Sequence, residues 1–175
     1  MENALSKFSI LVVDDDRLIQ KLIFDVLIKL GFGKIHRVND AHAALQLLDT
    51  IVIDFIITDW RMGSMDGVTF ARHVRGSMRP YAAIPIIMLT GNAEKDQVVK
   101  ARDAGINEYL IKPFTMKELC RRINEVIEHP REYVMTPHYS GPSRRRQNST
   151  APHNAERRKK RRVSVVKDRD TLWVN

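Results

Sequence analysis

The sequence predicts an α/β fold in which short parallel strands alternate with helices, and two observations indicate this class. Between residues 8 and 128, short runs rich in β-branched residues alternate with segments whose apolar residues recur at three- and four-residue steps. This alternation is typical of βα units around a parallel sheet. The length of 175 residues suits one domain with an added segment, because roughly 100–150 residues already bury one core. We therefore expect one α/β domain with five strands and five helices.

The five predicted strands and the first three helices follow from β-branched runs, an apolar stripe and cap residues. The five predicted strands cover residues 9–13, 34–38, 55–58, 84–89 and 108–111. An apolar stripe on the first helix consists of Ile19, Leu22, Ile23, Val26 and Leu30. Gly31 predicts the end of this helix, Asp40 is expected to cap the second helix, and Gly67 opens the third.

The last two helices follow from start and stop residues. The fourth covers about residues 94–103 and is expected to stop near Gly105. The fifth begins at Thr115, which has capping-box spacing to Glu118, so each side chain can bind the free backbone N–H of the other residue. This helix should end near residue 128.

The charge of the chain is unevenly distributed. The formal net charge is +8, and residues 129–175 hold 12 of the 29 basic residues but only 4 of the 21 acidic ones. Residues 1–128 are therefore neutral, with 17 residues of each sign. Prolines interrupt the later segment, and its arginine clusters repel one another. We expect a domain at residues 1–128 and a basic, disordered extension at residues 129–175.

Composition also excludes several classes of protein. A single cysteine, Cys120, rules out an internal disulfide framework, and no secretory signal opens the chain. The longest apolar run, near residues 52–58, is too short to span a membrane. We expect a cytoplasmic protein without a membrane span.

Reactive side chains follow four of the five predicted strands. Asp14 and Asp15 follow the first strand, Asp59 the third, Thr90 the fourth and Lys112 the fifth. In a parallel open sheet, functional groups gather beyond the carboxyl ends of the strands. These five residues are therefore expected to form one site.

The chemistry of these residues suggests phosphoryl transfer. Carboxylates that lie close together repel one another, and a hard divalent cation relieves this repulsion. Mg²⁺ fits a site with a few carboxylates that must also admit water and a phosphoryl group. Asp59 could then attack phosphorus, while Lys112 and the Thr90 hydroxyl contact the phosphoryl oxygens.

At these residues the sequence resembles the receiver domain of bacterial two-component response regulators, including the single-domain chemotaxis type. The resemblance covers about residues 8–128 and rests on "VVDDD", "TDWRM..MDG", "LTG" and "YLIKPF" in this order. It implies a doubly wound, flavodoxin-like sheet with strand order 2-1-3-4-5. It also implies a phosphoprotein of a phosphorelay that receives its phosphoryl group from a histidine kinase or a phosphotransfer protein.

The resemblance further implies a role for each matching residue. Asp59 would be the phosphoacceptor, and Mg²⁺ would be held by Asp14, Asp15, Asp59 and the main-chain carbonyl of Arg61. Asp16 would lie outside the metal site.

Three further positions match residues that respond to the phosphoryl group in this family. Thr90 and Lys112 would bind the group, and Tyr109 would turn inward as Thr90 moves. The Lys112–Pro113 bond would be cis.

The loop after Asp59 departs from the family pattern at one position. Gly63 stands where proline is usual, so this loop is expected to be more mobile. Arg61 occupies a position that tunes the loss of the phosphoryl group in this family.

The sequence also allows other functions. One alternative is a Mg²⁺-dependent phosphohydrolase of the haloacid dehalogenase type, a class with the motif Asp-x-Asp-x-Thr or Asp-x-Asp-x-Val. Asp14 and Asp16 match the two aspartates of this motif, but Leu18 occupies its last position. The basic extension could bind nucleic acid or an anionic surface under control of the domain. A homodimer is a further expectation, and no output domain is apparent after residue 130.

Overall fold

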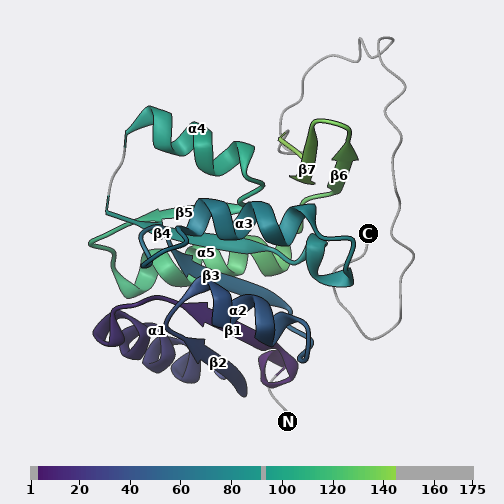
Figure 1. The fold of residues 1–175 in the computed structure, drawn as a ribbon. Helices are drawn as coiled ribbons and strands as arrows, with labels where there is room; N and C mark the ends of the chain where they lie inside the picture. Colours follow the sequence, from purple (N-terminus) through teal and green to yellow (C-terminus); the bar gives the residue numbers. More distant parts are fainter. Residues whose placement is uncertain (1–3, 92–93, 145–175) are drawn as a thin grey trace, which may run out of the picture.

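The structure of the chain, a computed structural model, describes residues 4–91 and 94–144. Within these residues, five parallel strands form one sheet in the order β2-β1-β3-β4-β5, which confirms the predicted fold (Figure 1). The strands are β1 (Ser9–Val13), β2 (Lys34–Val38), β3 (Phe55–Asp59), β4 (Ile86–Thr90) and β5 (Glu108–Ile111). The helices are α1 (Arg17–Leu30), α2 (Ala41–Leu48), α3 (Gly67–Gly76), α4 (Lys95–Asp103) and α5 (Met116–Glu128). Short 3-10 helices, η1 (Ala4–Lys7) and η2 (Pro80–Ala83), precede β1 and β4.

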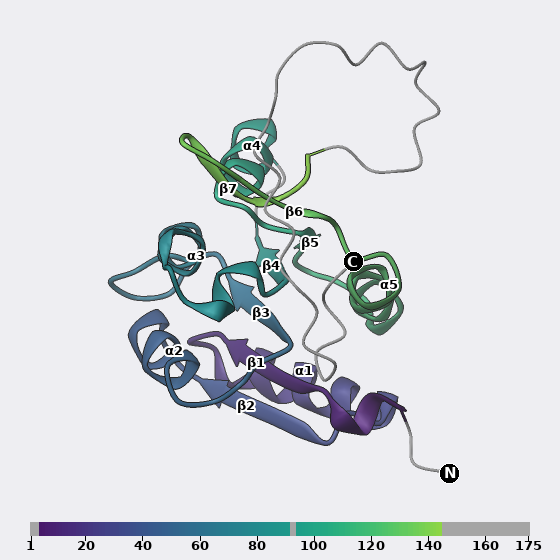
Figure 2. The same cartoon turned by 90° about the vertical axis from the view of Figure 1, so that its right-hand side faces the viewer.

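Helices cover both faces of the sheet (Figure 2). Ile23 of α1 and Leu119 of α5 belong to the buried cluster on one face, and Phe70 of α3 belongs to the cluster on the other. β1, β3 and β4 are buried along their whole length because helices pack against both of their sides. Cys120 lies partly buried against the cluster under α1 and α5.

Side chains cap the helices at the predicted positions. The Asp40 carboxylate accepts a hydrogen bond from the Ala43 N–H at 2.8 Å. Thr115 and Glu118 form the predicted capping box, in which each accepts from the backbone N–H of the other. Gly31 ends α1 with φ of 95°, a conformation that glycine adopts without strain.

Replacement of Thr115 by Ala is expected to destabilise the fold by about 1 kcal/mol, the usual cost of a lost N-cap. The substitution removes the acceptor of the Glu118 N–H, which lies 3.2 Å from Thr115 Oγ1. Urea unfolding followed by circular dichroism measures this change. A Thr115→Ser variant keeps the hydroxyl and should unfold close to wild type; equal losses in both variants would contradict a capping role.

β4 begins two residues later than the sequence predicts. Ile84 and Pro85 were expected in the strand, but β4 starts at Ile86 and includes Thr90. Pro85 has no N–H to donate to a neighbouring strand, and only its carbonyl takes part, accepting from the Ile56 N–H at 2.9 Å. The strand therefore starts after the proline.

Arg75 of α3 is buried although its side chain is charged. Its Nε donates to the Gly105 carbonyl at 3.0 Å, and its Nη1 donates to the carbonyls of Ala82 and Ile84 at 2.6 and 2.7 Å. Its Nη2 donates to Asn107 Oδ1 at 3.0 Å. Burial lowers the pKa of Arg75 to about 10, so the guanidinium remains charged at neutral pH. Arg75 thus joins α3 to η2 and to the connection between α4 and β5.

Residues beyond α5 form a β-hairpin. β6 (Tyr133–Thr136) pairs with β7 (Tyr139–Pro142) in antiparallel register, and β7 packs against α3 and η2. The prediction that the chain is disordered from residue 129 onward is therefore wrong for residues 133–142. Pro137 lies in the turn, and Pro142 is the last residue of β7, where the missing N–H is tolerated at the edge of a sheet.

The rest of the predicted extension, residues 145–175, lies outside the described residues. Among the residues that are described, the chain has no helix that is both long and apolar enough to cross a membrane.

Candidate functional site

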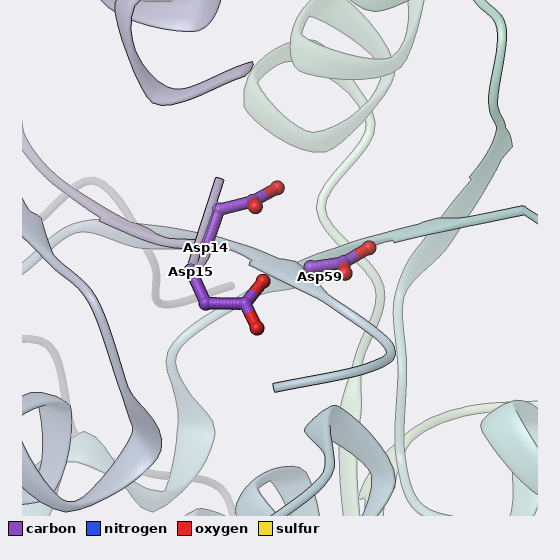
Figure 3. A group of neighbouring side chains, drawn as sticks. All are labelled: Asp14, Asp15 and Asp59. Carbon is purple, nitrogen blue, oxygen red and sulfur yellow. The ribbon is translucent and has the colours of Figure 1, made fainter. Parts of the chain in front are cut away.

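Three carboxylates meet at the carboxyl edge of the sheet. Asp14 and Asp15 follow β1, and Asp59 is the last residue of β3, the neighbouring strand. One carboxylate oxygen from each residue lies within 4.8 Å of the others (Figure 3). Asp14 is 1% exposed and Asp59 8%, whereas Asp15 is exposed. The site is thus open to solvent on the side of Asp15.

Lys112 joins two of these carboxylates. Its Nζ lies 2.9 Å from Asp14 Oδ2 and 2.9 Å from Asp59 Oδ1. Burial alone lowers the pKa of Lys112, but the hydrogen bonds to Asp59 and Asp14 outweigh this effect and raise it. The ammonium group is therefore charged at neutral pH and faces the acceptor oxygens.

Asp14 is held in place by the residues that follow it. Its Oδ1 accepts a hydrogen bond from the Asp16 N–H at 2.9 Å, and its carbonyl accepts from Gln20 Nε2 at 2.6 Å. Gln20 also donates to the Val38 carbonyl at 2.8 Å, which ties the start of α1 to β2. Burial raises the pKa of Asp14, although the Asp16 N–H and Lys112 act in the opposite direction.

The roles of two residues near the site, Gln20 and Gly67, were not identified from sequence. Gln20 does not belong to the apolar stripe predicted for the first helix, and only its buried hydrogen bond to the Asp14 carbonyl shows that it positions Asp14. Gly67 lies against the Asp59 backbone, and a Cβ at this position would overlap the Asp59 carbonyl. The glycine at the start of α3 was apparent, but its contact with Asp59 depends on the path of the intervening loop.

Thr90 and Tyr109 lie on the strands next to Asp59. Thr90 ends β4, is 2% exposed, and accepts a hydrogen bond through its carbonyl from the Lys112 N–H at 2.6 Å. Tyr109 of β5 is half-buried and packs against the cluster under α2 and α3. The Lys112–Pro113 peptide bond is cis, as expected.

The loop after Asp59 is fixed at its two ends. The Trp60 N–H donates to the Leu89 carbonyl at 2.8 Å, and the Gly67 N–H donates to the Trp60 carbonyl at 2.7 Å. Arg61 is exposed in this loop, and Gly63 has φ of 41°, which favours glycine. The roles predicted for Arg61, as a metal ligand through its carbonyl and as a residue that tunes phosphoryl loss, remain predictions.

The other nearby aspartates have structural roles. Asp16 caps α1 by accepting from the N–H groups of Leu18 and Ile19, in agreement with its place outside the metal site. Asp66 caps α3 by accepting from the Thr69 N–H at 2.7 Å. Neither carboxylate belongs to the group formed by the three site aspartates.

A doubly wound sheet with this set of strand-end residues defines the receiver class of signalling domains. The model of the response regulator receiver domain family matches residues 10–124. The chain belongs to this family.

Comparisons with individual proteins agree with this assignment. The chain is 37% identical over 119 residues to the chemotaxis protein CheY of Pseudomonas aeruginosa, covering 68% of this chain and 95% of that protein. It is 33% identical over 129 residues to CheY-3 of Vibrio cholerae, covering 73% and 98%.

Solved structures show the same fold. A response regulator from Chloroflexus aurantiacus superposes with a TM-score of 0.63 at 31% identity, covering 68% of this chain and 96% of the other. The receiver domain of a sensor histidine kinase from Pseudomonas aeruginosa gives 0.61 at 32% identity, covering 67% and 95%. That second structure has a magnesium ion coordinated in its active-site cleft.

Proposed function

We propose that the chain is a phosphorylation-dependent signalling protein that accepts a phosphoryl group on Asp59 and then changes its protein partners. The arrangement of Asp59 with Asp14, Asp15 and Lys112 at one edge of the sheet carries this proposal. Membership of the receiver family supports a histidine kinase or a phosphotransfer protein as the donor. The proposal keeps the cytoplasmic location expected from the sequence.

Asp59 supplies the nucleophile. One of its carboxylate oxygens attacks the phosphorus of a phosphohistidine, the new O–P bond forms, and the N–P bond breaks as the imidazole leaves with the bonding electrons. Lys112, already in contact with Asp59, neutralises charge on the transferred oxygens, and the Thr90 hydroxyl donates a hydrogen bond to one of them. The chain modifies its own side chain, so it acts as a phosphoacceptor regulator.

Asp14, Asp15 and Asp59, with the Arg61 carbonyl, are the residues that would hold Mg²⁺. The carboxylates fit this ion because they offer hard oxygen ligands on one open side of the site. When bound, Mg²⁺ offsets the repulsion between these carboxylates and the incoming phosphoryl group. The magnesium ion in the histidine kinase receiver domain supports this choice of metal.

Phosphoramidate with Mg²⁺ is expected to add one phosphoryl group to the intact chain, and EDTA is expected to abolish the addition. Without a divalent cation, the site carboxylates repel the donor and Lys112 alone offsets their charge. Intact mass spectrometry measures the fraction of phosphorylated chain at matched ionic strength. Addition of excess Mg²⁺ to the EDTA sample should restore it. An equal yield with EDTA would contradict the role of the metal, and no adduct on folded protein would contradict the proposed function.

The phosphohydrolase hypothesis has less support than the phosphoacceptor function. It would require Asp16 to act as the second catalytic aspartate, but the Asp16 carboxylate caps α1. Nucleic-acid or anionic-surface binding depends on basic residues beyond residue 144, outside the described part of the chain. These functions and the homodimer therefore remain predictions from the sequence.

A further inference from the structure

We propose that residues 131–144, here called the hairpin segment, hold the connection between α4 and β5 in the arrangement of the unphosphorylated chain. Phosphorylation of Asp59 would then loosen the hairpin segment. This inference rests on the proposed function, because the phosphoryl group on Asp59 is the signal that reaches the segment. The hairpin segment lies after the region that the receiver family matches, residues 10–124.

Two ion pairs attach the hairpin segment to both ends of the α4–β5 connection. Arg144 Nη2 lies 3.0 Å from Oδ1 of Asp103, the last residue of α4. Arg131 Nη2 lies 3.2 Å from Oε1 of Glu108, the first residue of β5. Glu108 is 4% exposed and also pairs with Arg122 of α5 at 2.7 Å. A buried carboxylate is costly unless it is paired. Burial of Glu108 therefore stabilises the arrangement in which Arg122 and Arg131 both contact it.

Between these ion pairs, the hairpin rests on the connection itself, beside the end of α4 (Figures 1 and 2). Ser140 Oγ donates to the Arg75 carbonyl at 2.9 Å, and the Arg75 Nε donates to the Gly105 carbonyl at 3.0 Å. Gly141 approaches Gly105 so closely that a Cβ on Gly141 would lie 2.8 Å from the Gly105 Cα. The connection cannot move toward the hairpin without displacing it.

β5 links these contacts to the phosphorylation site. Glu108 begins the strand, and Lys112 follows its last residue, about 13 Å along an extended chain. Lys112 now contacts Asp59 directly at 2.9 Å. A phosphoryl group on Asp59 would displace this direct contact, and the proposal is that the end of β5 shifts together with the Lys112 side chain.

The direction of the coupling follows from where these contacts are observed. They are observed in a chain whose Asp59 carries no phosphoryl group, and the proposal takes them to be weaker in other positions of β5 and α4. A phosphoryl group that stabilises another position of β5 and α4 must act against these contacts. By thermodynamic linkage, phosphorylation then weakens the binding of the hairpin segment to the rest of the domain. The hairpin segment would therefore restrain phosphorylation, and its release would be one output of the chain.

Hydrogen exchange on the full chain tests this coupling. Amides of residues 133–142 should exchange about five-fold faster or more after phosphorylation, the lower end of usual allosteric coupling. Intact mass on the same sample measures the phosphorylated fraction, and an Asp59→Asn sample treated identically controls for the donor. Unchanged or slower exchange in chains that carry the phosphoryl group would overturn the inference alone. Failure to phosphorylate folded chain would overturn the proposed function and the inference together.

Arg131→Gln gives a second test from the opposite direction. This variant loses one pair to Glu108 but keeps the Arg122 pair, so the domain should stay folded. Its phosphorylation by phosphoramidate is expected to be about five-fold faster than wild type. Arg121→Gln removes the same charge from an exposed position on α5 and should match wild type. Equal rates for the two variants would contradict a restraint by the hairpin segment.

Discussion

Replacement of Asp59 by Asn is expected to leave the folded chain without any phosphoryl adduct after treatment with phosphoramidate and Mg²⁺. The amide is nearly isosteric with the carboxylate, but it lacks the anionic oxygen that attacks phosphorus. It also removes one of the two carboxylates that contact Lys112, at 2.9 Å. Intact mass of wild type and variant, treated in parallel, measures the result. The expected change is from one adduct to none.

A matched control comes from the same cluster of aspartates. Asp16→Asn makes the same chemical change near the site, but Asp16 caps α1 instead of facing Asp59. Asn is as good an N-cap as Asp, so this variant should remain folded and should still be phosphorylated. An adduct on Asp59→Asn that peptide mapping places on Asp14 or Asp15 would show that another carboxylate is the acceptor.

Replacement of Arg75 by Met is expected to destabilise the domain by roughly 3 kcal/mol, the largest stability effect that we predict. The substitution keeps much of the side-chain volume but removes the donor of the Gly105, Ala82 and Ile84 carbonyls. Asn107 Oδ1 also loses its bond to Arg75 but keeps the Ile86 N–H as a donor at 3.0 Å. Relief of the buried charge offsets part of this cost. Guanidinium unfolding measures the loss as a lower midpoint.

The control for Arg75→Met lies one turn earlier on the same helix. Arg72→Met removes the same charge from an exposed position of α3, and its midpoint should stay close to that of wild type. If both variants lost the same stability, the effect would come from net charge or helix propensity and not from the hydrogen bonds of Arg75. Slower unfolding of Arg75→Met than of wild type would also contradict its structural role.

The sequence alone was sufficient for the features that depend on neighbouring residues. Apolar periodicity and caps such as Thr115 with Glu118 located the helices, because these patterns act within one turn. The order of acidic, hydroxyl and basic residues at successive strand ends indicated a common site. The structure brings Asp14, Asp15, Asp59 and Lys112 together because parallel strands present their carboxyl ends at the same edge, whereas the role of Thr90 remains a prediction.

The tertiary structure decided what depends on distant residues. Lys112 reaches Asp14 across 98 positions of sequence, and only the folded sheet shows that Asp14 is buried while Asp15 is exposed. Arg75 looks like any polar residue of an amphipathic helix until η2 and the α4–β5 connection surround it. Residues 133–142 looked disordered because their prolines suggest breaks, yet Ser140 of the hairpin binds the Arg75 carbonyl, and Arg131, just before the hairpin, pairs with Glu108. Local patterns determine local conformation, whereas burial and pairing depend on contacts that exist only once remote segments have come together.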